Sequence, residues 1–347
     1  MPWSRVLTFV DPFQCQSAIQ SVNQAEILPT ARGNLHIEMT QVGMTKVRMQ
    51  RFKVNIPMIS TVVIASDRRA VGFLLEQSCC GLQHCGMPVT ENDIFMYHDD
   101  VVHQRSTSNY RFGTMSVPAN DFTVLCETIV GRALGEKPGH DFVRPDPALM
   151  SRLRKLHTAI GQLAHDTPDL LEQAEVSRAL EEQLIHAMVR CLAEGVDVET
   201  TMGYQRHDAV VARFEEFLEA NPDRPLYLTE ICAAIGVAER TLRASCQEHL
   251  GMGPIRFLTL RRMHLVRQAL LRADPSKETV TGVVTDHGFW ELGRFSVAYR
   301  GLFGESPSET LRRPTQQIVI RLDRPSSLPM IESHEHPQEH PRALAPN

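Results

Sequence analysis

Two stretches of the chain repeat one pattern, and this repeat constrains the fold more than any other feature of the sequence. They span residues 230–254 and 282–307. Each begins with a short apolar segment that ends at a glycine, Gly236 or Gly288, and glycine adopts the left-handed backbone of a tight turn without strain. A second segment follows, in which apolar residues recur four apart. With one extra residue after the second glycine, the copies pair Leu242 with Phe295, Cys246 with Tyr299, Leu250 with Phe303, and Pro254 with Pro307.

Each copy is typical of a helix-turn-helix, in which a short helix, a glycine-containing turn and a second helix follow one another. A single pattern of this kind is common, whereas two copies joined by one helix are specific. Pro254 suits the first turn of that joining helix, and residues 207–220 predict an amphipathic leading helix. The aromatic residues of the second copy are expected to pack inward; they are Phe289, Trp290, Phe295, Tyr299 and Phe303. The repeat therefore predicts an all-α domain over 207–313, with helix-turn-helix units at 228–249 and 279–302.

The predicted helical domain is neutral on average but polarised. Residues 207–313 hold 14 Lys+Arg and 14 Asp+Glu, whereas residues 240–272 hold seven arginines and one glutamate. The acidic residues gather in the leading helix instead. A basic face of this kind can follow a phosphate backbone, although the net charge of the whole chain is −5.

Three stretches carry a family likeness: LTEICAAIGVAERTL, LGMGPIRFLTLRRMHLVRQALL and GFWELGRFSVAYRGLFGESPSETLRR. They resemble the DNA-binding domain of the AraC/XylS transcription regulators, and the last is similar to the branch that includes ethanolamine-utilisation regulators. The resemblance implies seven helices, with the second helix of each unit in a major groove of double-stranded promoter DNA. It also implies a transcription activator that contacts RNA polymerase and has no enzymatic activity, while repression stays open.

The outward face of each second helix supplies the candidate DNA contacts. In the first unit these are Glu239, Arg240, Thr241, Arg243 and Gln247. The two arginines are the expected base readers, because a guanidinium matches the paired acceptors of guanine. In the second unit the candidates are Leu292, Arg294, Ser296 and Val297. Here the apolar pair suits thymine methyl groups and the polar pair suits phosphate, so the first unit is expected to read bases and the second to position the protein. The alternative for each arginine is a solvated charge or an ion pair.

The N-terminal part, residues 1–145, alternates apolar and polar residues in short runs such as NLHIEMTQVGMTKVRMQRFKVNI, which predicts strands. Turn residues separate the runs, which suggests a barrel or a sandwich, and we expect a β-rich effector-sensing domain of the barrel- or cupin-like kind. Residues 146–194 predict a helical pair that is either a lid on the β core or a dimer interface. Residues 195–206 are typical of a linker, and the Pro-, Ser- and His-rich residues 314–347 predict a disordered tail. The predicted fold class is α+β.

Two clusters of metal-ligating residue types lie in the N-terminal part: Cys79, Cys80, His84 and Cys85, and then His98, Asp99, Asp100 and His103. Metal sites need ligands that converge on one point, but neighbouring residues of a strand point to opposite faces. We therefore expect no metal ion and no cofactor, while a redox or metal role for the first cluster stays open. Two alternatives to a regulator remain. One is a metal-dependent cupin-type enzyme that uses His98 and His103, and the other is a co-regulator that binds another protein through residues 146–194.

Cysteine usage and apolar runs bear on the location of the protein. The eight cysteines follow no framework spacing, which suits a reducing cytoplasm. No secretory signal and no apolar run of membrane-spanning length is visible. The expected protein is therefore a cytoplasmic homodimer that responds to a small-molecule effector and has no membrane partner.

Overall fold

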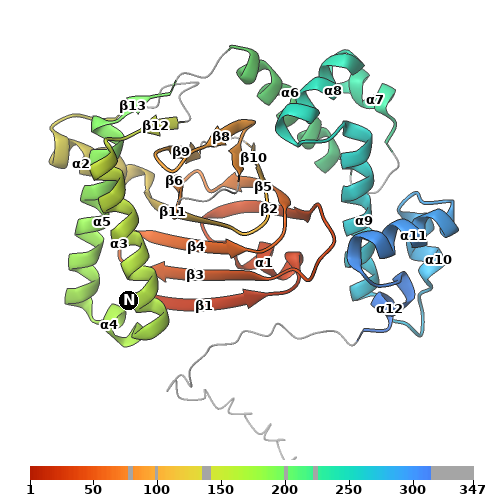
Figure 1. Ribbon diagram of the computed structural model, residues 1–347, viewed down its shortest axis with the longest axis horizontal. Coiled ribbons are helices and arrows are strands. Elements are labelled where there is room, and N and C mark those ends of the chain that lie inside the picture. The colour runs from red at the N-terminus through yellow and green to blue at the C-terminus, as the bar shows by residue number, and fades with distance from the viewer. Residues whose placement is uncertain (77–80, 98–100, 135–141, 199–201, 222–225, 314–347) are drawn as a thin grey trace, which may run out of the picture.

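Two antiparallel β-sheets lie face to face in the N-terminal part of the chain, as the computed structural model shows (Figure 1). The structure describes residues 1–76, 81–97, 101–134, 142–198, 202–221 and 226–313. The larger sheet has the strand order β1 (Trp3–Phe9), β3 (Ile37–Gly43), β4 (Arg48–Val54), β11 (Tyr110–Pro118), β6 (Arg68–Leu74), β9 (Ile94–Tyr97), β12 (Phe142–Arg144) and β13 (Val196–Asp197). The smaller sheet has the order β2 (Val22–Pro29), β5 (Met58–Ile64), β10 (Val101–Ser106), β7 (Leu82–His84) and β8 (Met87–Val89).

Side chains between the two sheets form one apolar core. Met39 and Phe52 of the larger sheet are buried there with Val62 and Val102 of the smaller sheet. Among the described strands none pairs with both sheets, so the larger sheet keeps β1 and β13 as edges and the smaller keeps β2 and β8. The expected α+β class is confirmed. Of the two expected forms, barrel or sandwich, the described strands form the sandwich, because the sheets meet through side chains and not through continuous strand pairing.

Four helices cover the outer face of the larger sheet (Figure 1); they are α2 (Ala119–Val130), α3 (Pro147–Asp166), α4 (Pro168–Glu172) and α5 (Ala174–Glu194). Leu153 of α3 and Met188 of α5 lie in one buried cluster with Phe73 of the sheet. The buried carboxylate of Glu181 in α5 accepts a hydrogen bond from the backbone nitrogen of Val47 at 2.8 Å, which ties the helix to the β3–β4 turn. The apolar residues of the helical pair are therefore buried against the sheet.

Seven helices follow among the described residues: α6 (Met202–Glu219), α7 (Leu228–Ile235), α8 (Glu239–His249), α9 (Pro254–Arg272), α10 (Val280–Asp286), α11 (Leu292–Phe303) and α12 (Pro307–Leu311). α6 begins at Met202, five residues before the expected leading helix, and so extends into the stretch expected to be a linker. Gly236 and Gly288 have φ angles of 69° and 77°, the left-handed turn that the repeat predicts. The expected anchors Leu242 and Phe295 are 0% and 4% exposed.

The C-terminal helices pack on the outer face of the smaller sheet. Leu28 of β2 and Ile59 of β5 are buried in the same apolar cluster as Phe214 of α6 and Leu258 of α9. The molecule therefore has four layers in the order helices α2–α5, larger sheet, smaller sheet and helices α6–α9, while α10–α12 pack on the far part of α9 (Figure 1). Across the described ranges, every helix is too short or too polar to cross a membrane.

Candidate nucleic-acid interface and sensor cavity

The first helix-turn-helix unit presents a polar face on α8. All five candidate residues of this helix are exposed: Glu239, Arg240, Thr241, Arg243 and Gln247. Nε of Arg243 donates a hydrogen bond to Oε1 of Glu239 at 2.8 Å, so this guanidinium is held by its own helix. An exposed pair of this kind contributes at most about 1 kcal/mol, which leaves Arg243 able to exchange Glu239 for another partner. Arg240 makes no ion pair with any residue that the structure describes.

The outward face of α11 is more apolar than that of α8. Its four candidate residues are also exposed: Leu292, Arg294, Ser296 and Val297. Nη1 of Arg294 donates to Oε2 of Glu291 at 2.8 Å. The hydroxyl of Ser296 donates to the backbone oxygen of Leu292 at 2.9 Å and so is turned toward the helix. Val297 is 76% exposed, which is unusual for an aliphatic side chain on a helix that has a buried side.

Trp290, in the turn before α11, does not pack inward as expected. It is 74% exposed. Its neighbour Phe289 takes the inward place instead, with its ring centroid 4.8 Å from that of Phe295. One aromatic ring therefore fills the space below the turn, and the second projects outward beside the exposed face of α11.

The basic stretch 240–272 does not all face solvent. Besides Arg243, which pairs with Glu239, three of its seven arginines contact residues outside the stretch: Arg261, Arg262 and Arg267. Nε of Arg261 donates to Oε1 of Glu26 in β2 at 2.9 Å, and the guanidinium carbon of Arg262 lies 5.2 Å from the ring centroid of Phe289. The positive charge that remains for an outside partner is therefore smaller than the composition of the stretch indicates.

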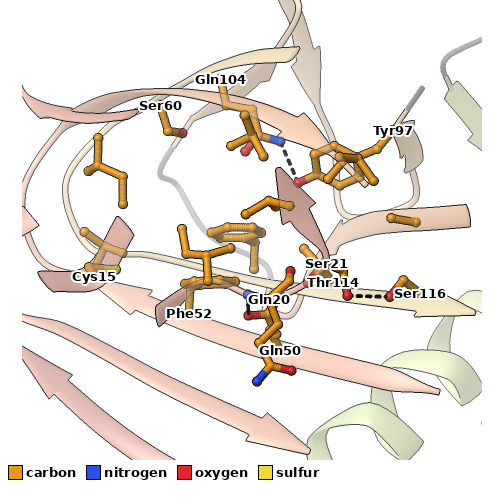
Figure 2. Close-up of a pocket in the computed structure, with 18 of the residues that line it drawn as sticks. Cys15, Gln20, Ser21, Gln50, Phe52, Ser60, Tyr97, Gln104, Thr114 and Ser116 are labelled. Atoms are coloured by element: carbon orange, nitrogen blue, oxygen red, sulfur yellow. Dashed lines mark hydrogen bonds between the residues drawn. The ribbon is translucent and has the colours of Figure 1, made fainter. Parts of the chain in front are cut away.

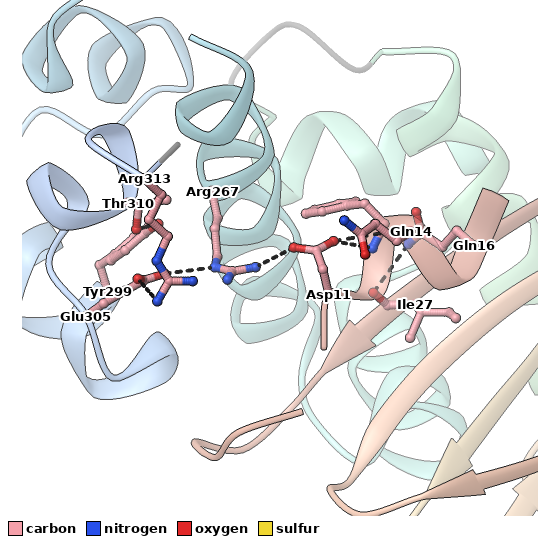
Figure 3. A network of polar contacts seen from close by, with 10 residues as sticks. Asp11, Gln14, Gln16, Ile27, Arg267, Tyr299, Glu305, Thr310 and Arg313 are labelled. Atoms are coloured by element: carbon pink, nitrogen blue, oxygen red, sulfur yellow. Dashed lines mark hydrogen bonds and ion pairs between the residues drawn. The ribbon is translucent and has the colours of Figure 1, made fainter. Parts of the chain in front are cut away.

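Arg267 joins the second helix-turn-helix unit to the β-sandwich (Figure 3). Its Nη1 donates to Oδ2 of Asp11 at 3.1 Å, and its Nε donates to Oε1 of Glu305 at 3.3 Å. Oδ1 of Asp11 also accepts a hydrogen bond from the backbone nitrogen of Phe13 at 2.8 Å and thereby caps α1 (Pro12–Ala18). Arg313 closes the network with a 2.5 Å contact to Oε2 of Glu305. These partly buried charges are screened less by salt than surface pairs, so the network holds three parts of the chain together.

A cavity of about 60 Å³ lies between the two sheets (Figure 2). None of the described residues that line it carries a charge. Its walls are mainly aliphatic and aromatic, and the rings of Phe52 and Phe112 stack there at a centroid distance of 4.7 Å. The cavity therefore suits an uncharged and largely apolar molecule.

Polar groups gather at two ends of the cavity (Figure 2). At one end Nε2 of Gln104 donates to the hydroxyl of Tyr97 at 3.2 Å. Burial raises the pKa of Tyr97, so its hydroxyl stays protonated at neutral pH. At the other end Oε1 of Gln50 accepts a hydrogen bond from the backbone nitrogen of Gln20 at 3.0 Å. A ligand of the right length would meet neutral hydrogen-bonding groups at both ends.

The described members of the two clusters of metal-ligating residue types, His84, Cys85 and His103, do not meet inside the sandwich. Cys79, Cys80, His98, Asp99 and Asp100 lie outside the described residues. Nδ1 of His84 accepts a hydrogen bond from Gln104 at 3.0 Å between the sheets. His103, one residue before Gln104 on β10, points to the opposite face, where its Nε2 lies 2.7 Å from Nδ1 of His249. Because His103 faces away from the cavity, it cannot hold a metal inside a cupin-like sandwich, as the enzyme alternative requires.

One protein family matches the C-terminal part of the chain. The family described as "Helix-turn-helix domain" matches residues 231–313. The chain is 32% identical over 185 residues to the "Probable thc operon regulatory protein" of Rhodococcus erythropolis, a match that covers 48% of this chain and 54% of that protein. It is 31% identical over 109 residues to the "XylDLEGF operon transcriptional activator 2" of Pseudomonas putida, which covers 31% of this chain and 69% of that protein.

The chain spans about half the length of the first of these relatives. Among solved structures, the AraC-like transcriptional activator CuxR matches 81% of this chain and 99% of its own at a TM-score of 0.38 and 12% identity, which is too low to carry an argument. The sequence matches include the turn glycines and buried anchors of both repeated units. The chain belongs to the AraC/XylS family of transcription regulators.

Proposed function

We propose that this protein activates transcription by binding promoter DNA through α8 and α11, and that a small neutral molecule in the sandwich cavity controls this binding. The observation that carries the proposal is the pair of exposed helix faces, each set over buried anchors and joined by α9. The relatives named as transcriptional activators support the direction of control. Contact with RNA polymerase and a homodimeric assembly are part of the proposal.

Within this proposal the two helices have different roles. Arg240 and Arg243 read guanine from α8, because each can present two parallel donors to one base, and Glu239, Thr241 and Gln247 complete that face. Arg294 of α11 contacts phosphate, and its exposed apolar neighbours contact thymine methyl groups. Arg240 is the leading reader, because no ion pair with a described residue has to break before it reaches a base.

The test is DNA binding by the full chain. Fluorescence anisotropy with the DNA upstream of its own gene, at several salt concentrations, gives the affinity and its salt dependence. We expect Arg240→Ala to weaken binding by about 1–3 kcal/mol and to relax specificity at one or two base pairs. Arg152→Ala is the matched control, because it removes the same charge from an exposed site on α3, away from α8.

Two results would contradict the DNA-binding proposal. One is the absence of salt-dependent binding to that DNA. The other is an equal loss of affinity for Arg152→Ala and Arg240→Ala, which would show that only net charge matters. Footprinting on the same DNA separates direct binding from a co-regulator that acts through the helical pair.

The uncharged wall of the cavity defines the proposed effector. Burying an ion without a partner is costly, and no lining side chain offers a counter-charge. We therefore expect benzyl alcohol to raise the thermal unfolding midpoint of the full chain more than benzoate or benzylammonium does at the same concentration and pH 7. Stronger stabilisation by either ion would contradict this assignment.

A matched pair of variants locates the effect. Val62 lines the cavity, whereas Val63, the next residue of β5, lies on the other face of the strand. Val62→Phe should abolish the stabilisation by benzyl alcohol, because the added ring fills the cavity. Val63→Phe should retain it. Equal responses of the two variants would place the ligand elsewhere.

A further inference from the structure

Four segments that are distant in the sequence meet where the β-sandwich touches the C-terminal helices. Cys85 and Gly86 form the two-residue turn between β7 and β8, with φ angles of 47° and 82°, as two-residue hairpin turns often require. The backbone nitrogen of Cys85 donates to the backbone oxygen of His103 on β10 at 2.8 Å. Gly86 presses on α8, because a Cβ placed there would lie 2.8 Å from the His249 ring. The turn therefore holds the Cys85 thiol near the His103 imidazole and next to the residue that contacts the His249 ring.

The potential ligand atoms converge at this junction. Nε2 of His103 lies 2.7 Å from Nδ1 of His249 and 3.4 Å from Oδ1 of Asp208 in α6. Nδ1 of His249 lies 3.7 Å from the same carboxylate oxygen. The ligand atoms of Cys85, His103 and Asp208 all lie within 4.8 Å of one another. Two nitrogen or oxygen ligands of a tetrahedral zinc ion are about 3.3 Å apart, given bonds of about 2.0–2.1 Å, so small shifts would suffice to bind one.

The chemistry of the group also fits a metal ion. His103 and His249 are each 1% exposed. A neutral imidazole has a lone pair that can bind a metal ion. The two nitrogens that face each other, Nε2 of His103 and Nδ1 of His249, also face Oδ1 of Asp208.

A second carboxylate, that of Glu215, lies near the other ring nitrogen of His103. Nδ1 of His103 lies 3.9 Å from Oε2 of Glu215 in α6, and within the described residues neither buried atom has a hydrogen-bond partner. A histidine that ligates a metal through one nitrogen commonly donates its other N–H to a carboxylate. Glu215 is placed to accept that hydrogen bond, while Thr61 of β5 holds its other oxygen with a 3.0 Å hydrogen bond.

We propose that Cys85, His103, Asp208 and His249 bind one zinc ion, which joins the β-sandwich to the C-terminal helices. Two ligands come from each side of the junction. One thiolate, two imidazoles and one carboxylate form a set that favours zinc over magnesium or calcium, which prefer oxygen ligands. The ion would fix the C-terminal end of α8 against the sandwich and so set where the first DNA-reading helix lies. The site does not depend on the proposed effector or on the identity of the bound DNA.

The test is metal binding by the full chain after removal of metal with a chelator. Zinc titration against a competing chromophoric chelator gives stoichiometry and affinity. Cobalt(II) as a substitute reports the ligands, because a tetrahedral site with a thiolate gives intense visible bands and a sulfur-to-cobalt charge-transfer band. We expect a single tight ion per chain with both spectral features.

Variants on the two sides of the junction test whether the ion bridges it. Cys85→Ser should remove the charge-transfer band, and His249→Gln should abolish tight binding. Cys232→Ser and His36→Gln are the matched controls, because these residues lie outside the cluster and should leave binding unchanged. Circular dichroism checks that each variant is folded.

Several outcomes would overturn the proposal. They are the absence of tight zinc binding in the wild-type chain, a cobalt spectrum without the sulfur band, or unchanged binding in folded His249→Gln. The histidines of the C-terminal segment, His334, His336 and His340, offer a competing site. Changing all three to Gln should leave the tight ion in place, and its loss in that variant would assign the metal to them instead.

Discussion

His157 of α3 is a titratable group buried inside the helical lid. It is 0% exposed, and its ring lies edge-on to Phe73 at a centroid distance of 5.1 Å. Nε2 donates a 3.3 Å hydrogen bond to the backbone oxygen of Thr114. Gly113 makes room for the ring, since a Cβ there would lie 2.6 Å from the imidazole. Burial lowers the pKa of His157 to about 3, so the folded protein keeps this histidine neutral.

The buried His157 predicts a loss of stability in mild acid. Below about pH 6.5 the unfolded chain gains a proton at this residue and the folded chain does not, which costs about 1.4 kcal/mol for each further pH unit down to the folded pKa. His157→Gln should therefore reduce the drop in unfolding free energy between pH 7.5 and 5.5 by about 1 kcal/mol, as measured by urea titration. His165→Gln, at an exposed site of the same helix, should leave the drop unchanged. Equal slopes in wild type and His157→Gln would contradict the prediction.

At the residue scale the sequence predicts which apolar side chains are buried better than it predicts which charged side chains pair. Periodicity alone identified Leu242 and Phe295 as buried, because a helix with one apolar side has one way to face a core. It could not separate Arg240, which is exposed, from Arg261, which pairs with Glu26 of β2. That pair spans 235 positions, and no local pattern encodes a contact of that range.

The turn before α11 contains two neighbouring aromatic rings with opposite environments. Phe289 is packed against Phe295, and Trp290 is 74% exposed. We expect Trp290→Ala to change the unfolding free energy by less than about 0.5 kcal/mol, because it removes no buried contact. If Trp290 contacts DNA beside α11, the same variant should weaken promoter binding by about 1 kcal/mol or more.

Phe289→Ala is the contrasting variant of the same turn. It should destabilise the protein by about 2–4 kcal/mol, because it leaves a cavity below α11. Thermal unfolding and anisotropy on the two variants separate stability from binding. A large stability loss for Trp290→Ala, or unchanged DNA binding in both variants, would remove the turn from the proposed DNA interface.

Helix α1 and helix α9 share one carboxylate, Asp11. Asp11→Asn should keep the cap on α1, because an amide oxygen can accept the same backbone hydrogen bond, but it removes the charge that faces Arg267. We expect a loss of about 1–3 kcal/mol in unfolding free energy, since a mostly buried charge loses one of two partners. Asp11→Ala should lose about 1 kcal/mol more through the missing cap. Equal stabilities of Asp11→Asn and wild type in urea would show that the ion pair contributes nothing.

At the element scale the repeat predicted both helix-turn-helix units, because glycine turns and apolar anchors are local signals. The sequence could not decide between barrel and sandwich, because alternation predicts a strand's buried side but not whether its sheet closes. The zinc-ligand group was also out of reach from the sequence. Cys85 and His103 each lie in a cluster that does not converge locally, and their proposed partners, Asp208 and His249, come from helices more than 100 residues further along the chain.

Across the whole molecule, the apolar cluster around Leu28 and Ile59 predicts that the sandwich and the C-terminal helices unfold together. Wild-type urea transitions followed by far-ultraviolet circular dichroism and by tryptophan fluorescence should coincide, since Trp3 and Trp290 report on the two parts. Ile59→Asp places a charge in that cluster and should split the transitions or lower both midpoints. Val63→Asp, on the same strand but half-buried, should have a smaller effect.

The packing of α6 and α9 on β2 and β5 limits how freely the parts of this regulator can be exchanged. A C-terminal domain moved onto another sensor would expose Phe214 and Leu258, unless the new sensor offered an apolar sheet face of the same shape. The same holds for charge, because Arg261 and Arg267 would lose Glu26 and Asp11. Chimeric regulators built from this protein should therefore keep the whole β-sandwich together with the DNA-reading helices.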